Sequence, residues 1–498
     1  MTRQTVSALF LVLLASLLQS CYTVGPDYVS PRQSTPDAWS RSVLRDLDGD
    51  AASLSEWWEG FRDPALNALI ARARASNPNL RLALERITEA RALRGIAASQ
   101  ALPQANGSGS YSRERFSENT RIRSGAAAAA GQGGIPATNA NNPSNLYTTG
   151  FDAGWEIDLF GGIRRSVESA EANIAAQEEN YRDSLVTLFA DVALNYVDYR
   201  TLEARISVAG RNITAQRDSV DLTRKRLEAG LVPRIDVTQA ETNLALSEAS
   251  VPQLRAQLAL SKNRLATLTG GFPASVEKIL GKRHGIPVPR AGYSAGLPAD
   301  LLRARPDIRR AERELAAQTA RVGVATADLY PRFSLFGDFR LQAVNSGDLF
   351  DSSSRAYSFG PSFQWQIFSA GRIRNNIRVE ESRVAQAYAA YESTILEAVE
   401  EVETSMAAIV YERERLSDLT RAVSSSTETV GLVKDNYQNG LVSFQNVLDA
   451  ERTKFSAEDE ETSSRGAIAR NYIILYKALG GGTATELIPP AVPVPAKP

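Results

Sequence analysis

The 18 residues YTTGFDAGWEIDLFGGIR at positions 147–164 decide the fold, because they recur as YSFGPSFQWQIFSAGRIR at positions 357–374. In both copies a Tyr, a Gly, a Trp and an Ile-Arg pair stand at matching places, 210 positions apart (357 minus 147). The same offset relates the Gly-Leu-Val segments that begin at Gly230 and Gly440. Self-similarity at a constant offset indicates internal repetition. The chain therefore contains two copies of one unit.

The first copy carries an insertion. Upstream of the repeated stretch the offset becomes 228, as between Pro78 and Pro306 or between Pro103 and Pro331 (306 minus 78). The first half must then hold 18 extra residues (228 minus 210) before position 147. They fall in the Gly-, Ala- and Asn-rich stretch 124–145, whose composition is typical of an exposed loop.

Apolar and polar residues alternate over 147–159, 333–342 and 357–367, which predicts strands with one apolar face. A weaker strand is expected over 104–116. A soluble β-sandwich with one solvent-exposed face on each sheet would give the same pattern. Aromatic residues near the strand ends and lengths close to the roughly 9–11 residues of membrane strands favour an outer-membrane barrel. Since the smallest such barrels use about eight strands, several chains must share one barrel.

Two very long helices are expected, over 163–229 and 373–439, each followed by a shorter helix, over 235–268 and 444–479. Apolar residues recur in the first long segment at steps of three and four, in two stripes. At 1.5 Å per residue, roughly 65 residues span about 100 Å. A rod-like coiled coil would explain the stripes, but not why strands and long helices recur together in both halves.

Composition argues against several function classes. The 56 basic and 57 acidic residues nearly cancel, whereas nucleic-acid binding needs a basic excess. The single Cys excludes a disulfide within the chain, and with one His, His284, a Cys/His zinc cluster is excluded too. His284 stands in a polar stretch that reads as a loop. We therefore expect no enzyme, no catalytic residue, no metal site and no cofactor.

Residues 1–20 read as a signal peptide, with Arg3 before an apolar run of about 11 residues, too short to cross a bilayer. The segment Leu18-Gln19-Ser20-Cys21 resembles the lipobox of bacterial lipoproteins. This resemblance implies a covalent N-terminal lipid on Cys21, including palmitate, and Tyr22 rather than Asp after it implies sorting to the outer membrane. A signal peptide without lipidation is the alternative.

The chain resembles the outer membrane factor family, the TolC-like channels, and within it the NodT-type efflux lipoproteins. The motifs that carry the resemblance are Cys21 with Gly25-Pro26-Asp27-Tyr28 and Pro31; Trp57-Trp58 with Phe61, Asp63-Pro64 and Leu66; Leu297-Pro298 with Leu301-Leu302; Arg305-Pro306-Asp307-Ile308 with Ala311-Glu312; Tyr437 with Gly440 and Val447-Leu448-Asp449-Ala450; and Leu475-Tyr476-Lys477-Ala478-Leu479-Gly480-Gly481. The resemblance implies an α+β membrane protein: a trimeric 12-strand β-barrel, with four strands per protomer, continuous with a 12-helix periplasmic α-barrel.

On this basis we expect the following segments: a signal peptide 1–20; an N-terminal, equatorial part 21–62; a helix within 63–102; a first hairpin 103–160 with an extracellular loop 117–145; a long helix pair 161–270; an equatorial linker 271–297; a helix within 298–330; a second hairpin 331–369 with a loop 344–356; a second helix pair 370–480; and a flexible tail 481–498.

The resemblance also implies a gate at the periplasmic helix tips. Asp449 matches an aspartate ring at the constriction, where three carboxylates would repel each other and attract cations. Gln445, one turn earlier, stands where some relatives carry an apolar ring residue, and Tyr437 matches a tyrosine that bonds between neighbouring helices. The docking tips for an adaptor would be two turns, Gly230, Leu231, Val232 and Gly440, Leu441, Val442. Each glycine also suits a helix C-cap, and Asp449 could simply be a solvated carboxylate.

The expected function is a passive exit duct for small molecules (drugs, toxic compounds or metal ions) in a tripartite efflux system. Its partners would be two further copies of the chain, a periplasmic adaptor, an inner-membrane pump of the RND type and outer-membrane lipid, with no nucleic acid. The expected location is the outer membrane, with the protein extending into the periplasm. A channel for type I protein secretion and a non-conducting structural envelope lipoprotein are the alternatives.

Overall fold

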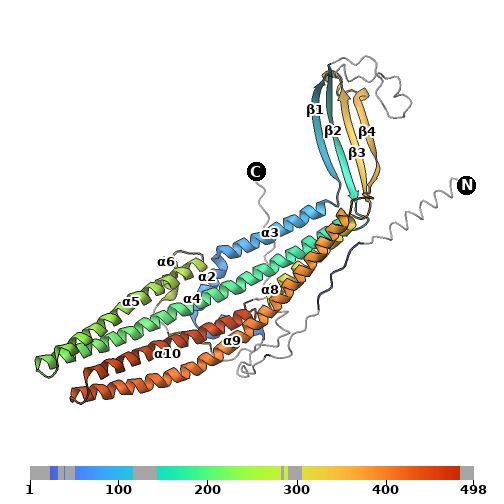
Figure 1. Cartoon of the computed structure of the whole chain (residues 1–498). Coiled ribbons are helices and arrows are strands. Elements are labelled where there is room, and N and C mark those ends of the chain that lie inside the picture. Colours follow the sequence, from blue (N-terminus) through green and yellow to red (C-terminus); the bar gives the residue numbers. More distant parts are fainter. Residues whose placement is uncertain are drawn as a thin grey trace. The chain divides into compact units, whose positions relative to one another are not determined.

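The computed structural model describes residues 23–31, 39, 51–115, 143–281, 285–289 and 305–482, and Figure 1 shows its helices and strands. Cys21, His284 and most of the expected insertion 124–145 lie outside these residues. Described residues 23–29, 91–115, 143–172 and 316–386 form one compact unit, and the remainder form a second.

The first unit contains a four-stranded antiparallel sheet of order β1-β2-β3-β4. Its strands are β1 (Gln104–Glu114), β2 (Ser144–Ile157), β3 (Arg332–Ala343) and β4 (Arg355–Gln364). Each repeat supplies one hairpin, and β2 pairs with β3 to join the repeats. Phe151 of β2 lies opposite Phe339 of β3, and their rings stack with centroids 5.4 Å apart. The turn after β3 contains two short 3-10 helices, η5 (Ser346–Asp348) and η6 (Ser352–Ser354).

The two repeated tryptophans tie the sheet to the helices that precede it. The indole nitrogen of Trp155 donates to the carbonyl of Ala101 at 2.9 Å, and that of Trp365 donates to the carbonyl of Leu329 at 3.0 Å. Trp365 itself lies just beyond β4, which ends at Gln364, so the last part of the expected strand 357–367 is not a strand. The matched indole bonds explain why Trp recurs at this position in both repeats.

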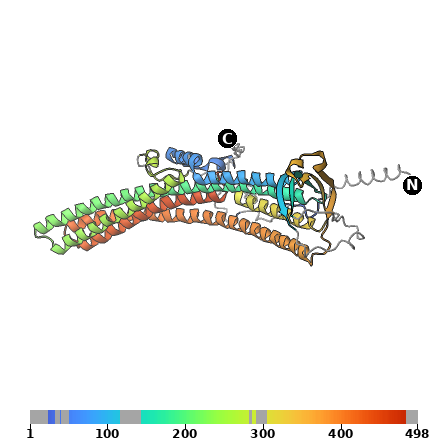
Figure 2. The same ribbon diagram turned by 90° about the horizontal axis from the view of Figure 1, so that it is seen from above.

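The second unit contains α5 (Arg234–Leu268), α10 (Phe444–Ala478) and most of α4 (Gly162–Glu228) and α9 (Arg372–Gln438). The helices α4 and α9 have 67 residues each, and α5 and α10 have 35 each. Figures 1 and 2 show α5 running along α4 and α10 running along α9. Both repeats therefore fold into the same helical hairpin, a long helix followed by a half-length one.

The single helix expected within 63–102 is two helices, α2 (Pro64–Ser76) and α3 (Pro78–Ser99). Asn77 between them has extended backbone, φ −70° and ψ 124°, because a residue before proline is driven out of helical geometry. The side chain of Asn77 accepts a hydrogen bond from the amide of Asn79 at 2.8 Å, and Asp63 caps α2 in the same way. The remaining helices are η2 (Ala51–Phe61), α6 (Ala274–Leu280) and α8 (Pro306–Ala327), the expected start of the last at 298 lying outside the described residues.

The main core of the second unit lies where η2, α2, α4 and α10 meet. Trp57, Tyr196, Tyr472 and Tyr476 are among its largest fully buried side chains, and the rings of Trp57 and Tyr476 stack at 5.2 Å. Arg200 is buried with them, donating to the Tyr196 hydroxyl, to Glu203 and to the carbonyl of Leu280. A buried guanidinium is tolerated here because each of these acceptors compensates for lost hydration. Within the described residues, no helix is apolar over enough length to cross a membrane.

Candidate functional site

The two hairpin turns have one backbone geometry. Gly230 and Gly440 have φ of 72° and 76°, in the left-handed region that favours glycine. At the first turn the amide of Gly230 donates to Leu227 and that of Leu231 donates to Arg226; at the second, Gly440 donates to Tyr437 and Leu441 to Asn436. This pair of bonds is the Schellman motif, which satisfies the last carbonyls of a helix. The expected helix C-caps are therefore present at both tips.

The leucines that follow these glycines face solvent. Leu231 is 66% exposed and Leu441 is 73% exposed. In a Schellman motif this residue often packs on an apolar residue one turn back, but here the positions are polar, Arg226 and Asn436. The next residues, Val232 and Val442, are half-buried against the apolar cluster beneath them. Each tip thus presents one free leucine on a supported turn.

We call the apolar cluster beneath the turns the tip cluster. It draws on all four long helices and comprises Val220 of α4, Ala240 of α5, Tyr437 of α9, and Phe444, Val447 and Leu448 of α10. The rings of Tyr437 and Phe444 lie 5.3 Å apart. Because every helix contributes, the two hairpins share one core near their ends. Movement of one hairpin against the other must therefore disturb this cluster.

Tyr437 links the two hairpins with its hydroxyl as well as its ring. The hydroxyl donates to Oδ2 of Asp236 on α5 at 3.3 Å. From α4, the Arg226 guanidinium lies 4.9 Å from the ring centroid and donates to the carbonyl of Gln438 at 2.6 Å. Burial, followed by the charge and hydrogen bond of Asp236, raises the pKa of Tyr437 to about 12. The phenol is thus a neutral hydrogen-bond donor over the physiological range.

Asp449 and Gln445 stand one turn apart on α10, and both are exposed in the single chain. The amide nitrogen of Gln445 donates to Oδ1 of Asp449 at 3.0 Å, so the two predicted gate residues form one polar pair. At the matching places of the first repeat (445 minus 210 and 449 minus 210) stand Ile235 and Gln239. At these two matched positions only the second repeat therefore carries a carboxylate.

A neighbouring carboxylate that the sequence analysis did not single out is buried between the hairpins. Glu451 of α10 accepts from the Ser219 hydroxyl of α4 at 2.6 Å and pairs with Lys434 of α9 at 2.7 Å. Its counterpart Glu241 pairs with Arg224, the counterpart of Lys434 (224 plus 210). In both repeats a basic residue stands 17 positions before the glutamate (241 minus 224). This recurrence is the sequence signal that could have identified Glu451.

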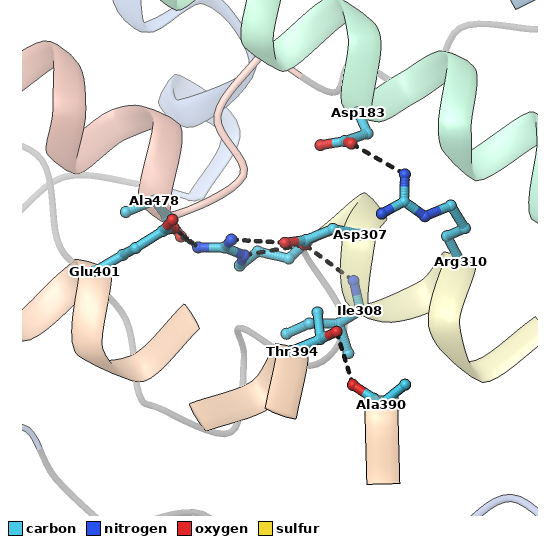
Figure 3. A network of polar contacts seen from close by, with 9 residues as sticks. Asp183, Asp307, Ile308, Arg310, Ala390, Thr394, Glu401 and Ala478 are labelled. Carbon is cyan, nitrogen blue, oxygen red and sulfur yellow. Dashed lines mark hydrogen bonds and ion pairs between the residues drawn. The ribbon is translucent and has the colours of Figure 1, made fainter. Parts of the chain in front are cut away.

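A second charged cluster ties the start of α8 to the end of α10 (Figure 3). Arg305 donates to both carboxylate oxygens of Asp307 at 3.0 and 2.6 Å, to Glu401 at 2.7 Å and to the carbonyl of Ala478 at 2.9 Å. Burial by itself would raise the pKa of Asp307, but the hydrogen bonds and charge of Arg305, with the amide of Ile308, lower it overall. This carboxylate remains ionised and bound.

The Arg305 cluster has a neutral counterpart in the first repeat. Asn77 donates from its side chain to the carbonyl of Leu268 at 2.8 Å. Asn77 and Arg305 are related by the 228 offset, and Leu268 and Ala478 by the 210 offset. The segment 305–307 is therefore the second-repeat version of a clamp that joins the start of one helix to the end of another. Among the described residues, no group of three or more His, Cys, Asp or Glu side chains is placed to hold a metal ion.

Residues 69–271 and 297–481 match the family described as outer membrane efflux protein. The chain belongs to this family. It is similar to nodulation protein T of Rhizobium leguminosarum bv. viciae, with 32% identity over 95% of this chain and 93% of that protein. It is also similar to the solvent efflux pump outer membrane protein SrpC of Pseudomonas putida, with 30% identity over 94% of this chain and 96% of that protein.

Among solved structures, the outer-membrane channel OprN matches with a TM-score of 0.82 and 35% identity, over 92% of this chain and 99% of that one. These findings confirm the predicted family and the TolC-like fold. The protein is an outer-membrane efflux channel rather than an enzyme. The roles of Asp449, Gln445, Tyr437 and the two tips, and the lipid on Cys21, remain predictions.

Proposed function

We propose that three copies of this channel protein form one duct for small molecules, which opens at its periplasmic helix tips when an adaptor binds. The four-stranded sheet supports a shared barrel, because β1 and β4 are its outer strands among those described. Unpaired strand edges need partners inside a membrane, and three four-stranded sheets give the expected 12 strands. The duct would be passive, with an inner-membrane pump of the RND type supplying the energy.

The observation that carries the gating proposal is the set of polar bonds that join the two hairpins near the tips. Tyr437 bonds Asp236, Arg226 bonds the carbonyl of Gln438, and Ser219 bonds Glu451. Each bond connects a residue of the first hairpin with one of the second, above turns whose leucines are free to bind a partner. An adaptor that binds the turns could then shift a two-state equilibrium by separating the hairpins.

Small molecules are the proposed cargo, and because a duct of this kind need not recognise what it carries, we propose no single compound. Solvents are named for the relative SrpC. For this protein we propose the broader class of drugs, toxic compounds or metal ions. Exposed Asp449, repeated around a three-fold axis, would make the narrowest level attract cations and exclude anions.

The test of the gate is Asp449→Ala in planar bilayers. We expect higher single-channel conductance and greater antibiotic leak in cells, because removing three mutually repelling, hydrated carboxylates widens and neutralises the constriction. The matched control is Gln239→Ala, the same position in the first repeat, which should leave conductance at the wild-type level. If Asp449→Ala forms normal amounts of trimer and its conductance is unchanged, Asp449 is not part of the gate.

We also propose that Cys21 carries the N-terminal lipid. Metabolic labelling with a palmitate analogue should mark the wild-type protein and leave Cys21→Ala unlabelled. Label retained by Cys21→Ala would place the acyl chain elsewhere and contradict the lipobox interpretation.

A further inference from the structure

The first described residues, 23–31, form a segment without helix or strand, which we call the N-terminal strap. Val24 of the strap is nevertheless only 3% exposed, and its amide donates to the carbonyl of Phe160 at 3.1 Å. Phe160 lies in the turn between β2 and α4, and its ring stacks on Tyr330, between α8 and β3, with centroids 4.6 Å apart. The strap is therefore bound where the sheet of the first unit leads into its helices.

Arg165 of α4 holds the strap with most of its donor groups, and its side chain is only 4% exposed. Its Nε donates to the carbonyl of Val24 at 3.1 Å. One terminal nitrogen donates to the carbonyl of Gly25 at 3.3 Å and to Oδ1 of Asp27 at 2.6 Å, and the other donates to Glu168 at 2.8 Å. The strap thus supplies three of these four acceptors, which a buried guanidinium needs to offset its lost hydration.

Three glycines allow the strap to approach the helices closely. Gly25 has φ of 87°, and a Cβ on it would lie 2.4 Å from the Cα of Gly323 in α8. A Cβ at Gly161, just before α4, would lie 2.6 Å from a methyl carbon of Thr23. A Cβ at Gly323 would lie 2.8 Å from the Arg165 side chain. Since no Cβ fits at these distances, the strap and its groove are complementary in shape as well as in charge.

The matching positions of the second repeat lack these contacts. Asn375 stands where Arg165 does (165 plus 210), and Gly95 is the counterpart of Gly323 (323 minus 228). Among the described residues, a Cβ at Gly95 would meet nothing within 4 Å. Gly371, the counterpart of Gly161, keeps the positive φ of the turn at 83°, but the nearest atom to a Cβ there would be the Asn375 amide nitrogen at 3.7 Å. The arginine and the close contacts therefore belong to strap binding and not to the repeated turn.

We propose that Gly161, Arg165 and Gly323 form a binding site for an extended peptide, and that the strap is a ligand of this site carried on the same chain. The site recognises a glycine with positive φ, two successive backbone carbonyls and a carboxylate two residues after the glycine. Pro26 restricts the backbone between Gly25 and Asp27, which lowers the entropy cost of binding. A separate peptide with the sequence of the strap therefore binds the same site.

A peptide that displaces the strap would act on the channel protein outside its duct. Cys21 stands two residues before Thr23 in the chain. Displacement would thus separate the end of the chain proposed to carry the lipid from the rest of the protein. This consequence rests on the proposed lipid, whereas the peptide site does not depend on it.

The test cuts the strap from the full-length protein without removing it. A recognition sequence for a specific protease is inserted after position 34, and an affinity tag is placed at the C-terminus. After cleavage in detergent, we expect the N-terminal fragment to stay with the tagged remainder, as measured by mass spectrometry of the eluate. Excess synthetic peptide TVGPDYVSP, residues 23–31, should displace it. The same peptide with Asp27→Asn should compete about tenfold less well, because it lacks the charge-assisted bond to Arg165.

Variants of the groove give matched comparisons. Arg165→Met and Gly323→Ala should each release the fragment about tenfold faster or more after cleavage. Gly95→Ala, the same position in the first repeat, should retain the fragment like the wild type. Arg164→Met, which removes the guanidinium that pairs with Asp158, should retain it too.

A further variant, Asp27→Asn in the full chain, keeps the test decisive if a groove variant does not fold. The Asp27 side chain is 85% exposed, so this change does not disturb the core, and it should speed release of the fragment. Circular dichroism of each uncleaved variant checks that it is folded.

Three results would overturn the proposal. The first is loss of the wild-type fragment on cleavage as fast as from Arg165→Met. The second is displacement by a peptide of scrambled sequence as effective as that by the strap peptide. The third is a fragment that a large excess of the strap peptide does not displace, which would show that other contacts hold it. None of these results bears on conductance, so the proposed duct is tested separately.

Discussion

Tyr437 shows how a single side chain can hold a closed tip. Its ring is buried in the tip cluster, and only its hydroxyl reaches Asp236 of the other hairpin. We predict that Tyr437→Phe keeps the cluster but loses about 1 kcal/mol of the hydrogen bond between the hairpins. The ratio of open to closed channel should rise about fivefold in single-channel recordings.

Asp236→Ala should give a similar rise, and the double variant should add little, because both changes remove one bond. An additive double variant would show that the two residues act independently. The bond also has a pH dependence of defined sign. Since the pKa of Tyr437 is raised from 10.0 to about 12, its stabilisation is complete below pH 10 and is lost as the pH rises through 12. Tyr437→Phe should lack this loss between pH 10 and 12.

Arg305 and Asn77 allow the same clamp to be compared in an ionic and a neutral form. We predict that Arg305→Met lowers unfolding stability by about 3 kcal/mol, because Asp307 and the Ala478 carbonyl lose their partner. Asn77→Ala should cost about 1–2 kcal/mol through the lost cap and the bond to Leu268. Urea unfolding followed by circular dichroism measures both.

The exposed Arg415→Met serves as control for the clamp and should change stability by less than about 0.5 kcal/mol. Arg305→Lys should not restore the loss, because an ammonium group cannot bond both oxygens of Asp307 in a planar fork. Equal effects of Arg305→Met and Asn77→Ala would contradict the ionic contribution.

At the scale of the element, the hairpin turns depend on backbone conformation rather than on packing. A Cβ at Gly440 would meet nothing within 4 Å, yet its φ of 76° is unfavourable for other residues. We predict that Gly440→Ala destabilises the second hairpin by about 1–2 kcal/mol. Gly431→Ala, nine residues earlier in α9 and equally open, should instead stabilise it by roughly 1 kcal/mol. Opposite signs in thermal unfolding confirm the assignment, and equal signs contradict it.

Strand β1 is an element that its own residues predict only weakly. Its sequence, QANGSGSYSRE, has little alternation, and the strand was expected only weakly. It forms because eleven of its residues, from Gln104 to Glu114, pair with β2. The pairing is with residues far along the chain, and a Gly/Ser-rich strand gains its order from such bonds rather than from its own side chains.

At the scale of the whole molecule, the two repeats have the same order of helices and strands, but they differ in which side chains they expose to solvent. Both tips carry a free leucine, so we predict that Leu231→Asp combined with Leu441→Asp lowers adaptor binding at least tenfold. Placing a charge on an apolar contact surface costs well over 1.4 kcal/mol, which is the equivalent of that factor. Binding of the purified adaptor by surface plasmon resonance measures the effect.

The double variant should still assemble, because neither leucine supports the tip cluster. Ile235→Asp, also exposed near the first tip but on α5 rather than in the turn, is the matched control and should bind more nearly like the wild type. Normal adaptor affinity of the leucine variant would place the docking surface elsewhere.

The sequence by itself determined the duplication, the helix pairs, the glycine turns and three of the four strands. These features follow from local periodicity and from a constant offset, so no distant contact is needed to find them. It also predicted the gate and tip residues, through the resemblance to a family that the comparisons then confirmed.

Only the tertiary structure decided which residues at matching positions of the two repeats differ in burial and in bonding partners. Glu451 is buried between the hairpins while Glu241 is only half-buried, although both follow an alanine and pair with a base. Likewise Asn77 and Arg305 perform one clamping role with different chemistry. The physical reason is that burial and ion pairing depend on which helix lies alongside. The residues on one helix face do not specify which helix packs against it.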